Sequence, residues 1–471
     1  MKIKNCLYYL GLSCFPISIL SLANIFYSYY FDHLLNVNTY LIVLVSSLFF
    51  GLFLFFFGKK FKGDINIYEQ IFLVFLVYFF ISFFILIPFY LSIYEVSFID
   101  SFFESISGLT GTGFTIFTDI QNLDPPLILW RSSSQWIGGL YFMIFIILIF
   151  SNKKVSFKLT DLSFNLEKKI NFSPNLVYVT NRILFIYSSL TLIILTLFLI
   201  SGIRIFDSLN LTMTIISSGG FLPTNSLNDI IRSNFQSIIL CICFLFPILN
   251  FYLLYNLFFN RDNLKEHRED IYLIVLIIIF SIFSFLMSKS SLVSVFINIL
   301  SSIGTSGIST VPVPENYSLY FIILTLVGGS VFSTTSGIKF LRIYILIKAF
   351  LMEMYKLVKP NVMLNTRIML SEKKINSDNI KMSFLIFILF FLSLFILSSI
   401  LLFDFLNFEN SFKLSILTLT NTLASNIYGI SDIEFVELFT FSKISLIIFM
   451  VIAKAELLAI FILARKVFFK N

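Results

Sequence analysis

Apolar runs of about 20 residues recur along the whole sequence, and they constrain the fold more than any other feature. At 1.5 Å per residue, a helix of this length crosses a hydrocarbon core about 30 Å thick. Ten runs fit, near residues 5–29, 38–57, 69–94, 127–151, 178–201, 235–258, 270–288, 317–349, 382–403 and 440–464. The chain is 58% hydrophobic and only 13% charged, far more apolar than a soluble domain. We therefore predict an all-α polytopic membrane protein.

The basic residues gather in alternate connections between these runs. Clusters occur at "GKKFKGD" (58–64), in 152–169, at "NRDNLKEHRED" (260–270), in 356–381 and in the tail "RKVFFKN" (465–471). Connections on the other side, such as "SIYEVSFID" (92–100) and "TDIQNLDPP" (118–126), are acidic instead. Since cytoplasmic loops carry an excess of Lys and Arg, the pattern predicts that both termini are cytoplasmic.

Four apolar segments are too short to cross a bilayer, and each is followed by small polar residues. They are "DSFFESISGLTGTGFT" (100–115), "DSLNLTMTIISSGGFLP" (207–223), "SVFINILSSIGTSGIST" (294–310) and "SFKLSILTLTNTLASNI" (411–427). Each begins with a residue able to cap a helix N-terminus: Asp100, Asp207, Ser294 or Ser411. Gly113, Gly219, Gly307 and Ala424 follow these at intervals of 13, 12, 13 and 13 positions. Four occurrences in register indicate a repeated half-helix and loop.

The repeat predicts a pore. Non-helical backbone at membrane depth is tolerated only where it is buried in protein or lines a water-filled cavity. Four such loops can meet around one axis, and rings of carbonyl oxygens replace the hydration shell of a cation. The half-helices would point their partially negative C-terminal ends at that axis.

The repeats also divide the chain. We expect two extra N-terminal helices in 1–64, followed by pore repeat 1 in 65–170, repeat 2 in 171–265, repeat 3 with a broken helix in 266–355, and repeat 4 in 356–471. The predicted fold class is therefore four helix–pore-loop–helix repeats around a central pore, plus two N-terminal helices.

These motifs resemble the Trk/Ktr/HKT superfamily of potassium uptake transporters, and most closely its bacterial TrkH/TrkG branch. The likeness covers nearly the whole chain and includes "FFESISGLTGTGFT", "LWRSSSQWIGGLYFMIFII", "SSGGF" (217–221), "SSIGTSG" (301–307) and "VGGSVFSTTSGIKFLRIYILIK" (327–348). In that family the filter loops bind K⁺ through backbone carbonyls. The resemblance implies that K⁺ is the transported ion, that there is no covalent cofactor, and that the chain is not an enzyme. It assigns the filter to Gly111, Thr112, Gly113, Ser217, Ser218, Gly219, Thr305, Ser306, Gly307, Thr422, Leu423 and Ala424.

The fourth loop departs from the family. Where the family reads like N-N-L-G-P-G-L, this chain has "NTLASNI" (421–427), which places Ala424 at the glycine position. Alanine disfavours positive φ by about 1 kcal/mol relative to glycine. We therefore expect a distorted fourth wall and weakened selection of K⁺ over Na⁺.

Small residues interrupt the long run at 317–349. "GGSVFSTTSG" (328–337) breaks helix regularity in mid-span, where the freed backbone needs polar partners. In the family this segment is a mobile loop that blocks the pore below the filter, although a kinked, closely packed helix is the alternative. The resemblance assigns the gate to Gly328, Gly329, Ser330, Ser333, Thr334, Thr335, Ser336, Gly337 and Lys339.

Two further charges lie in apolar surroundings. Lys454 stands in the last run, where the family has an arginine that lines the permeation path. An intramembrane charge is a functional candidate, and the alternatives are a structural pair with Glu456 or snorkelling to the surface. Glu104 lies in the first half-helix and is expected to orient its loop or to attract cations at the mouth.

The resemblance also implies partners and a location. We expect a multi-pass protein of the bacterial inner membrane that forms a homodimer, each subunit having its own pore. A cytosolic nucleotide-binding subunit of the TrkA/KtrA type would dock on the basic segments 152–182 and 356–381. No nucleic-acid partner is implied.

Other function classes fit less well. A serine protease around "GTSG" (304–307) would need a membrane-depth general base, yet the two histidines, His33 and His267, fall in predicted loops. An ion-coupled symporter also uses broken helices, but four parallel units favour a pore. A less selective K⁺/Na⁺ pathway and a non-conducting member of the family remain open alternatives.

Overall fold

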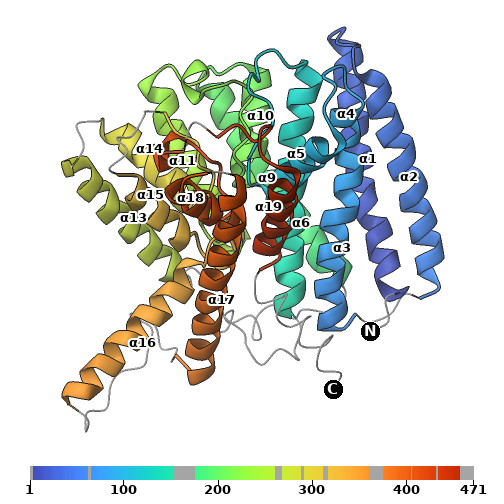
Figure 1. The fold of residues 1–471 in the computed structure, drawn as a ribbon. Coiled ribbons are helices and arrows are strands. Elements are labelled where there is room, and N and C mark those ends of the chain that lie inside the picture. Colours follow the sequence, from blue (N-terminus) through green and yellow to red (C-terminus); the bar gives the residue numbers. More distant parts are fainter. Residues whose placement is uncertain are drawn as a thin grey trace.

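The structure is a computed structural model that describes residues 4–61, 65–151, 176–259, 268–287, 291–310, 317–359, 375–404, 406–430 and 433–456. Within these ranges the regular structure is helical, and no strand is present (Figure 1). The predicted docking segments lie largely outside the described residues, at 152–175 and 360–374, as does the end of the last predicted span.

Long apolar helices form at the positions predicted for the spans. Among the described residues, six helices are long and apolar enough to cross a membrane by length and composition. They are α1 (Lys4–Tyr30), α2 (Val37–Lys59), α3 (Ile67–Ile85), which continues into the short α4 (Ile87–Tyr90), α9 (Leu176–Ile200), α13 (Arg268–Met287) and α17 (Ser377–Leu401). Helix α6 (Pro125–Ser151) is of similar length. These helices confirm a polytopic, all-helical membrane protein.

The helix predicted at 235–258 is not continuous. The structure divides it into α11 (Asn234–Ile248) and α12 (Phe251–Phe259), with Leu249 in an extended conformation. Pro247 in the last turn of α11 weakens the helix. The Asn250 side chain then begins α12, since its Oδ1 accepts a hydrogen bond from Tyr252 N at 2.9 Å. The prediction of one unbroken helix was wrong. The groups that pair with the backbone at this break lie far away in the sequence, so no local pattern indicated it.

The four short apolar segments form half-length helices, as predicted: α5 (Phe98–Thr110), α10 (Ile205–Ile216), α14 (Leu292–Ile303) and α18 (Phe408–Leu419). The predicted N-caps were wrong, because each helix begins about one turn earlier. Ser97 Oγ accepts a hydrogen bond from Asp100 N at 3.2 Å, and Ser291 Oγ accepts one from Ser294 N at 3.3 Å. Asp100 and Ser294 are therefore third helical residues, where polar side chains also satisfy N-terminal amides.

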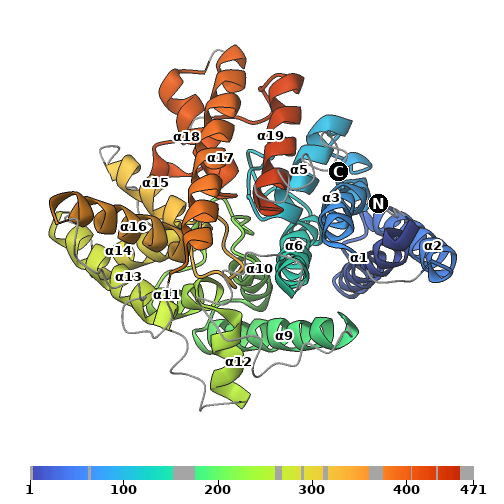
Figure 2. The same cartoon turned by 90° about the horizontal axis from the view of Figure 1, so that it is seen from below.

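The half-helices close a ring, seen along its axis in Figure 2. Each unit contacts the next: α6 packs on α10, α11 on α14, α15 (Ser318–Val327) on α18, and α19 (Thr440–Lys454) on α5. An ion pair between Lys443 Nζ and Asp100 Oδ1, at 2.6 Å, joins the last unit to the first. Helices α1 and α2 lie outside the ring, with α1 against α3 and α6.

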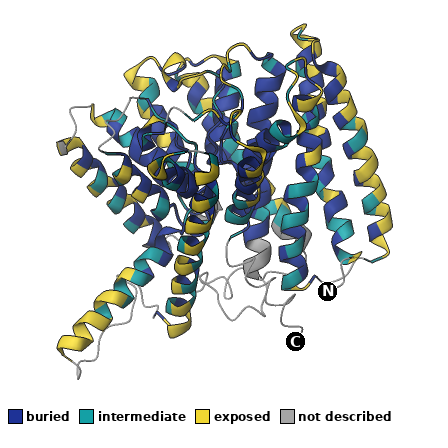
Figure 3. Cartoon of the chain, viewed as in Figure 1, coloured by how far each residue is buried: buried dark blue, intermediate teal, exposed yellow. Residues whose placement is uncertain are grey.

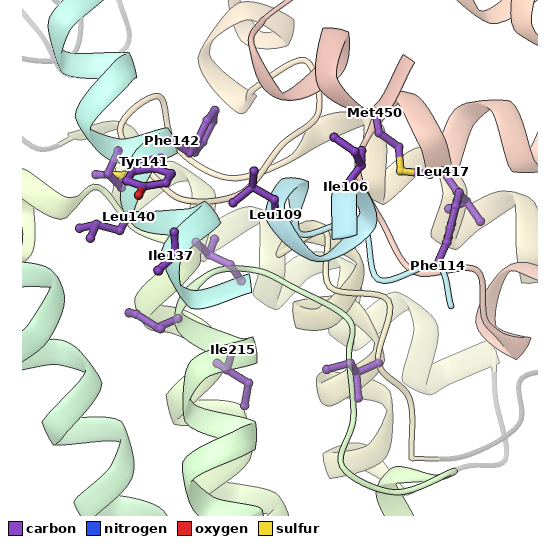
Figure 4. Packing of buried hydrophobic residues seen from close by; sticks show 14 of the residues in the cluster. Ile106, Leu109, Phe114, Ile137, Leu140, Tyr141, Phe142, Ile215, Leu417 and Met450 are labelled. Carbon is purple, nitrogen blue, oxygen red and sulfur yellow. The ribbon is translucent and has the colours of Figure 1, made fainter. Parts of the chain in front are cut away.

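Burial follows this arrangement. Side chains at the centre of the ring are buried, whereas α2 presents apolar residues outward (Figure 3). On α2, Phe49, Phe53 and Phe56 are all exposed, as expected for a helix that faces lipid. Leu109 of α5, Leu140 of α6, Ile215, Leu417 and Met450 belong to one apolar core cluster (Figure 4).

Candidate functional site: four converging loops

Each half-helix ends in the same hydrogen-bonded turn. The residue after the helix, or the one following it, has a positive φ: 72° at Gly111, 57° at Ser218, 55° at Thr305 and 47° at Asn421. The N–H of this residue donates to the carbonyl of residue i−3. The N–H of the following residue donates to the carbonyl five residues earlier in the sequence than that following residue. The second pattern joins Thr112 to Ser107, Gly219 to Thr214, Ser306 to Ser301 and Thr422 to Leu417. This is a Schellman-type ending, repeated four times.

The shared turn fixes the register between the repeats. Loop 1 is 111–113, loop 2 is 218–220, loop 3 is 305–307 and loop 4 is 421–423. Loops 1 and 3 match the predicted triplets. The predicted triplets of loops 2 and 4 are each displaced by one residue, so Gly220 and Asn421 were missed, and Ser217 and Ala424 lie just outside the equivalent positions. The actual repeat is regular: Gly113, Gly220, Gly307 and Leu423 each follow the third residue of their half-helix by 13 positions.

The expected backbone strain at Ala424 is absent. Gly113 and Gly307 have positive φ, at 85° and 73°, but in loop 4 the only described residue with positive φ is Asn421. Asparagine is among the residues that tolerate this conformation. Leucine and alanine at 423 and 424 therefore carry no penalty for positive φ. Loop 4 still differs from loops 1 and 3, because residue 423 does not adopt the positive φ of Gly113 and Gly307.

The four loops approach one another closely. A Cβ on Gly113 would lie 2.8 Å from Gly220 Cα, and a Cβ on Gly307 would lie 2.6 Å from Leu423 O. Between loops 4 and 1, Asn421 Nδ2 donates to Thr112 Oγ1 at 2.9 Å. Because backbone meets backbone at these points, side chains larger than hydrogen are excluded at both glycines.

Leu423 alone brings a side chain into this group of equivalent positions. Its Cβ lies 2.6 Å from the place of a Cβ on Gly220 and 3.0 Å from that on Gly307. The leucine therefore packs between loops 2 and 3. Above the loops, on the face away from the start of α1, a cavity of about 280 Å³ is lined by residues of all four units, including Gly113, Gly220, Gly307 and Leu423.

Glu104 lies behind loop 1 and not at a mouth. Its side chain is fully buried, and its carboxylate accepts hydrogen bonds from Arg131 Nε at 2.8 Å and from Ile116 N at 2.9 Å. The carboxylate thus fixes the segment that leaves loop 1, which agrees with an orienting role. It has no exposed surface with which to attract cations.

The segment 328–339 separates α15 from α16 (Phe340–Val358) and lies against the underside of the loops. Thr334 Oγ1 is 3.0 Å from Ser218 Oγ and donates to Ile216 O at 3.0 Å. Ser336 N donates to Thr305 Oγ1 at 3.0 Å. The predicted break in this span is therefore confirmed as a structural feature, and it contacts loops 2 and 3 directly.

Lys339 holds the segment in a compact form. Its Nζ donates to Ser333 O at 3.2 Å and to Thr335 O at 2.5 Å. Gly329 N donates to Thr335 Oγ1 at 3.0 Å across the same turn. The ammonium thus satisfies carbonyls that a helix would otherwise have paired.

A second set of contacts joins this segment to the break between α11 and α12. Ser330 N donates to Ile248 O at 3.0 Å, and Phe251 N donates to Phe332 O at 2.9 Å. Buried Glu269, at the start of α13, accepts a hydrogen bond from Val331 N at 3.0 Å. The two broken helices therefore pair some of each other's free backbone N–H and C=O groups. Glu269 was missed by the sequence analysis, where it was grouped with a basic loop; its only signal was an acidic residue at the very start of an apolar run.

Lys454 lies beneath loop 1. Its Nζ is 3.6 Å from the place of a Cβ on Gly111, donates to Ser336 Oγ at 3.3 Å, and lies 4.5 Å from the centroid of the Phe142 ring. Only 2% of the residue is exposed, so it does not snorkel. Glu456 pairs with Arg342 at 2.7 Å. The ammonium thus lies beside loop 1 and is hydrogen-bonded to the 328–339 segment.

Comparisons with known proteins agree with this architecture. No model of a known protein family matches the sequence. An uncharacterized cation transporter of Methanocaldococcus jannaschii is 27% identical across the whole of this chain and 97% of its own length. The Trk system potassium uptake proteins TrkH of Halomonas elongata and TrkG of Escherichia coli are 26% and 24% identical over 57% and 58% of this chain. The chain covers about three fifths of their length, 59% and 60%.

The crystal structure of the potassium transporter TrkH from Vibrio parahaemolyticus has the same fold. It matches with a TM-score of 0.86 over 98% of both chains, at 20% sequence identity. Fold and site together define a polytopic membrane protein with four half-helices and loops around one axis. In sequence the chain is similar to the Trk system potassium uptake proteins TrkH and TrkG, and it has the fold of TrkH. These relatives are transporters and not enzymes.

Proposed function

We propose that this protein conducts K⁺ through the four loops, down the membrane potential. The observation that carries the proposal is the fourfold repetition of one turn at Gly111, Ser218, Thr305 and Asn421, with loops that touch across a common axis. Such turns free carbonyl oxygens from helical pairing, and rings of carbonyls can replace the hydration shell of K⁺. The names of the Trk relatives support the choice of ion.

The 328–339 segment is the proposed gate. It lies below loops 2 and 3 and is hydrogen-bonded to both, so ions leaving the loops would meet it. Lys454 adds a buried positive charge at the same level, and an ammonium there opposes a cation. We infer that the described conformation is closed, and that conduction requires both groups to withdraw.

The repeat division at 1–64, 65–170, 171–265, 266–355 and 356–471 follows from this function, since each unit supplies one loop. The charge pattern supports cytoplasmic termini in the inner membrane of a bacterium, and in this proposal the cavity of about 280 Å³ is the outer mouth. A homodimer, with a TrkA/KtrA-type nucleotide-binding subunit docked on the basic segments 152–182 and 356–381, belongs to the same proposal and rests on the family resemblance alone.

One observation favours a second candidate, a less selective pathway for K⁺ and Na⁺. Leu423 replaces glycine at one of the four equivalent positions and packs between Gly220 and Gly307. A ring with three glycines and one leucine is asymmetric. Its carbonyls need not match the size and field that distinguish K⁺ from Na⁺.

Both candidates are tested by ⁸⁶Rb⁺ uptake in a bacterium that lacks its own K⁺ uptake systems, with and without a TrkA-type subunit. K⁺ conduction predicts growth rescue and uptake that excess Na⁺ barely inhibits, whereas the less selective pathway predicts strong inhibition by Na⁺. Gly220→Ala is the matched inactive variant, because its methyl would lie 2.6 Å from Leu423 Cβ. Gly202→Asn is the control, since nothing lies within 4 Å of that position. Absence of uptake under every condition would refute the proposal.

A further inference from the structure

Helix α6 supports loops 1 and 2 from behind with two polar side chains one turn apart, Arg131 and Gln135. Both are almost completely buried, at 1% and 0% exposure. Gln135 Oε1 accepts a hydrogen bond from Phe221 N at 3.2 Å, directly after loop 2. A full-length helix is a rigid support, so the positions of these side chains are set by α6 and not by the loops.

Arg131 fixes loop 1 through the acidic side chain of its half-helix. The guanidinium donates from Nε to Glu104 Oε1 at 2.8 Å and from Nη2 to Thr115 Oγ1 at 2.9 Å. Thr115 Oγ1 also lies 3.1 Å from Glu104 Oε1. Three side chains thus form one closed network where the chain leaves loop 1.

The same guanidinium reaches loop 2. Its Cζ lies 4.2 Å from the centroid of the Phe221 ring and 5.7 Å from that of Phe117. Within the described part of the chain, Arg131 Nη1 is buried and has no hydrogen-bond acceptor. Arginine stacks on aromatic faces in this way, and the interaction strengthens when water is excluded.

A lysine could not make both sets of contacts. The planar guanidinium presents donors in fixed directions and a flat face at the same time, whereas an ammonium is a single point charge. A buried pair that loses one partner leaves an uncompensated charge. At position 131, therefore, only arginine can contact both Glu104 behind loop 1 and the Phe221 ring after loop 2.

We infer that Arg131 is a specificity-determining positioning residue, which couples loop 1 to loop 2 through Glu104 on one side and Phe221 on the other. The inference rests on the proposed function, since it concerns which cation the loops select. Gly113 and Gly220 line the outer cavity together with Arg131, and a Cβ on Gly113 would be 2.8 Å from Gly220 Cα. A change in the guanidinium position would therefore alter the separation of loops 1 and 2, and with it the fit to K⁺.

The test compares variants of the full chain reconstituted in proteoliposomes. Phe221→Leu removes the ring but keeps Arg131, Glu104 and an apolar side chain, so it isolates the contact between the loops. Arg131→Lys keeps the charge and loses the planar fork. Arg204→Gln is the control, because it removes an arginine whose own side chain is largely exposed and which pairs with Asp207 on the neighbouring half-helix. ⁸⁶Rb⁺ uptake is measured against increasing Na⁺, and folding is monitored by thermal unfolding and gel filtration in detergent.

The expected result is a loss of the preference for K⁺ over Na⁺ by about fivefold in Phe221→Leu, which corresponds to a cation–π contact at the lower end of the usual range, with a similar or larger loss in Arg131→Lys. Unfolding temperatures of Phe221→Leu should stay close to that of the wild type. If Phe221→Leu folds and conducts with unchanged preference, the inference is overturned while the proposed function stands. If the wild type itself conducts no ion, the proposed function fails instead.

Discussion

The hydroxyl oxygens of Thr334 and Ser218 lie 3.0 Å apart, and this contact joins the broken helix of the third unit to the loop of the second. Thr334 Oγ1 also lies 3.0 Å from Ile216 O, at the end of the half-helix. The proposed gate is therefore attached to the proposed filter by side chains that a small substitution can remove without changing shape.

Thr334→Val should raise the basal uptake of ⁸⁶Rb⁺ about fivefold, because one buried hydrogen bond contributes about 1 kcal/mol to the closed conformation. The measurement is uptake into proteoliposomes without any regulatory subunit. Thr325→Val is the matched control: Thr325 is equally buried, but its hydroxyl bonds to Ile322 O within α15. Equal uptake by the two variants would show that Thr334 does not hold the gate.

Glu269 should be replaceable by glutamine but not by leucine. Its Oε1 accepts a hydrogen bond from Val331 N at 3.0 Å, and the amide oxygen of glutamine can accept the same bond. Leucine would leave that N–H unpaired, at a cost of about 1–3 kcal/mol. We expect raised basal uptake and a lower unfolding temperature for Glu269→Leu only. If Glu269→Gln behaves like Glu269→Leu, then the charge, and not the hydrogen bond, is what matters at this position.

Lys454→Met should increase the maximal rate of uptake by about tenfold, since relief of only 1.4 kcal/mol of repulsion at a few ångströms is sufficient for this change. Methionine keeps the unbranched stem beside Phe142, where the lysine Nζ now lies 4.5 Å from the ring centroid. Lys454→Arg is the comparison that retains the charge, and it should stay near the wild-type rate. A rate that does not depend on charge would place Lys454 outside the ion path.

Leu423→Gly and Ala424→Gly together test the register of loop 4. The hydrogen-bond pattern makes Leu423 the equivalent of Gly113, Gly220 and Gly307, so glycine there should restore a symmetric ring. We expect Leu423→Gly to sharpen the preference of ⁸⁶Rb⁺ uptake for K⁺ over Na⁺, and Ala424→Gly to change it less than twofold, since residue 424 is not in positive φ. The opposite order would support the register predicted from the sequence.

The sequence alone predicted the class of fold well. Spans of about 20 apolar residues can satisfy their backbone only as helices, and short apolar segments ending in glycine and hydroxyl residues indicated the half-helices correctly. The broken span at 328–337 was visible for the same reason, because its composition is incompatible with a regular helix. Lys454 and Glu104 were singled out as candidates because charges are rare in such a chain.

The register of the loops and the hydrogen-bond partners at the helix breaks could not be predicted from the sequence. The sequence interval placed Gly219 and Ala424 at the ends of their loops, one residue away from Gly220 and Leu423. In repeat 2 the interval of 12 fell one short of the 13 positions found in the other repeats, and in repeat 4 it was counted from Ser411, which is the fourth and not the third residue of its helix. The positions of glycines did not predict where loop 4 adopts a positive φ, since that conformation falls on Asn421. Only the hydrogen bonds of the folded turn distinguish these alternatives.

What the sequence by itself determined is therefore what hydrophobicity and local backbone preference control: the helices, their breaks and the fourfold repeat. Only the tertiary structure decided which groups meet at those breaks. Val331 N donates a hydrogen bond to Glu269, and Asn250 N donates one to Asp270 at 2.9 Å. Arg131 lies between Glu104 and Phe221. The physical reason is that a buried polar group must be satisfied, but which distant residue satisfies it depends on how the units pack around the axis, and no local pattern carries that information.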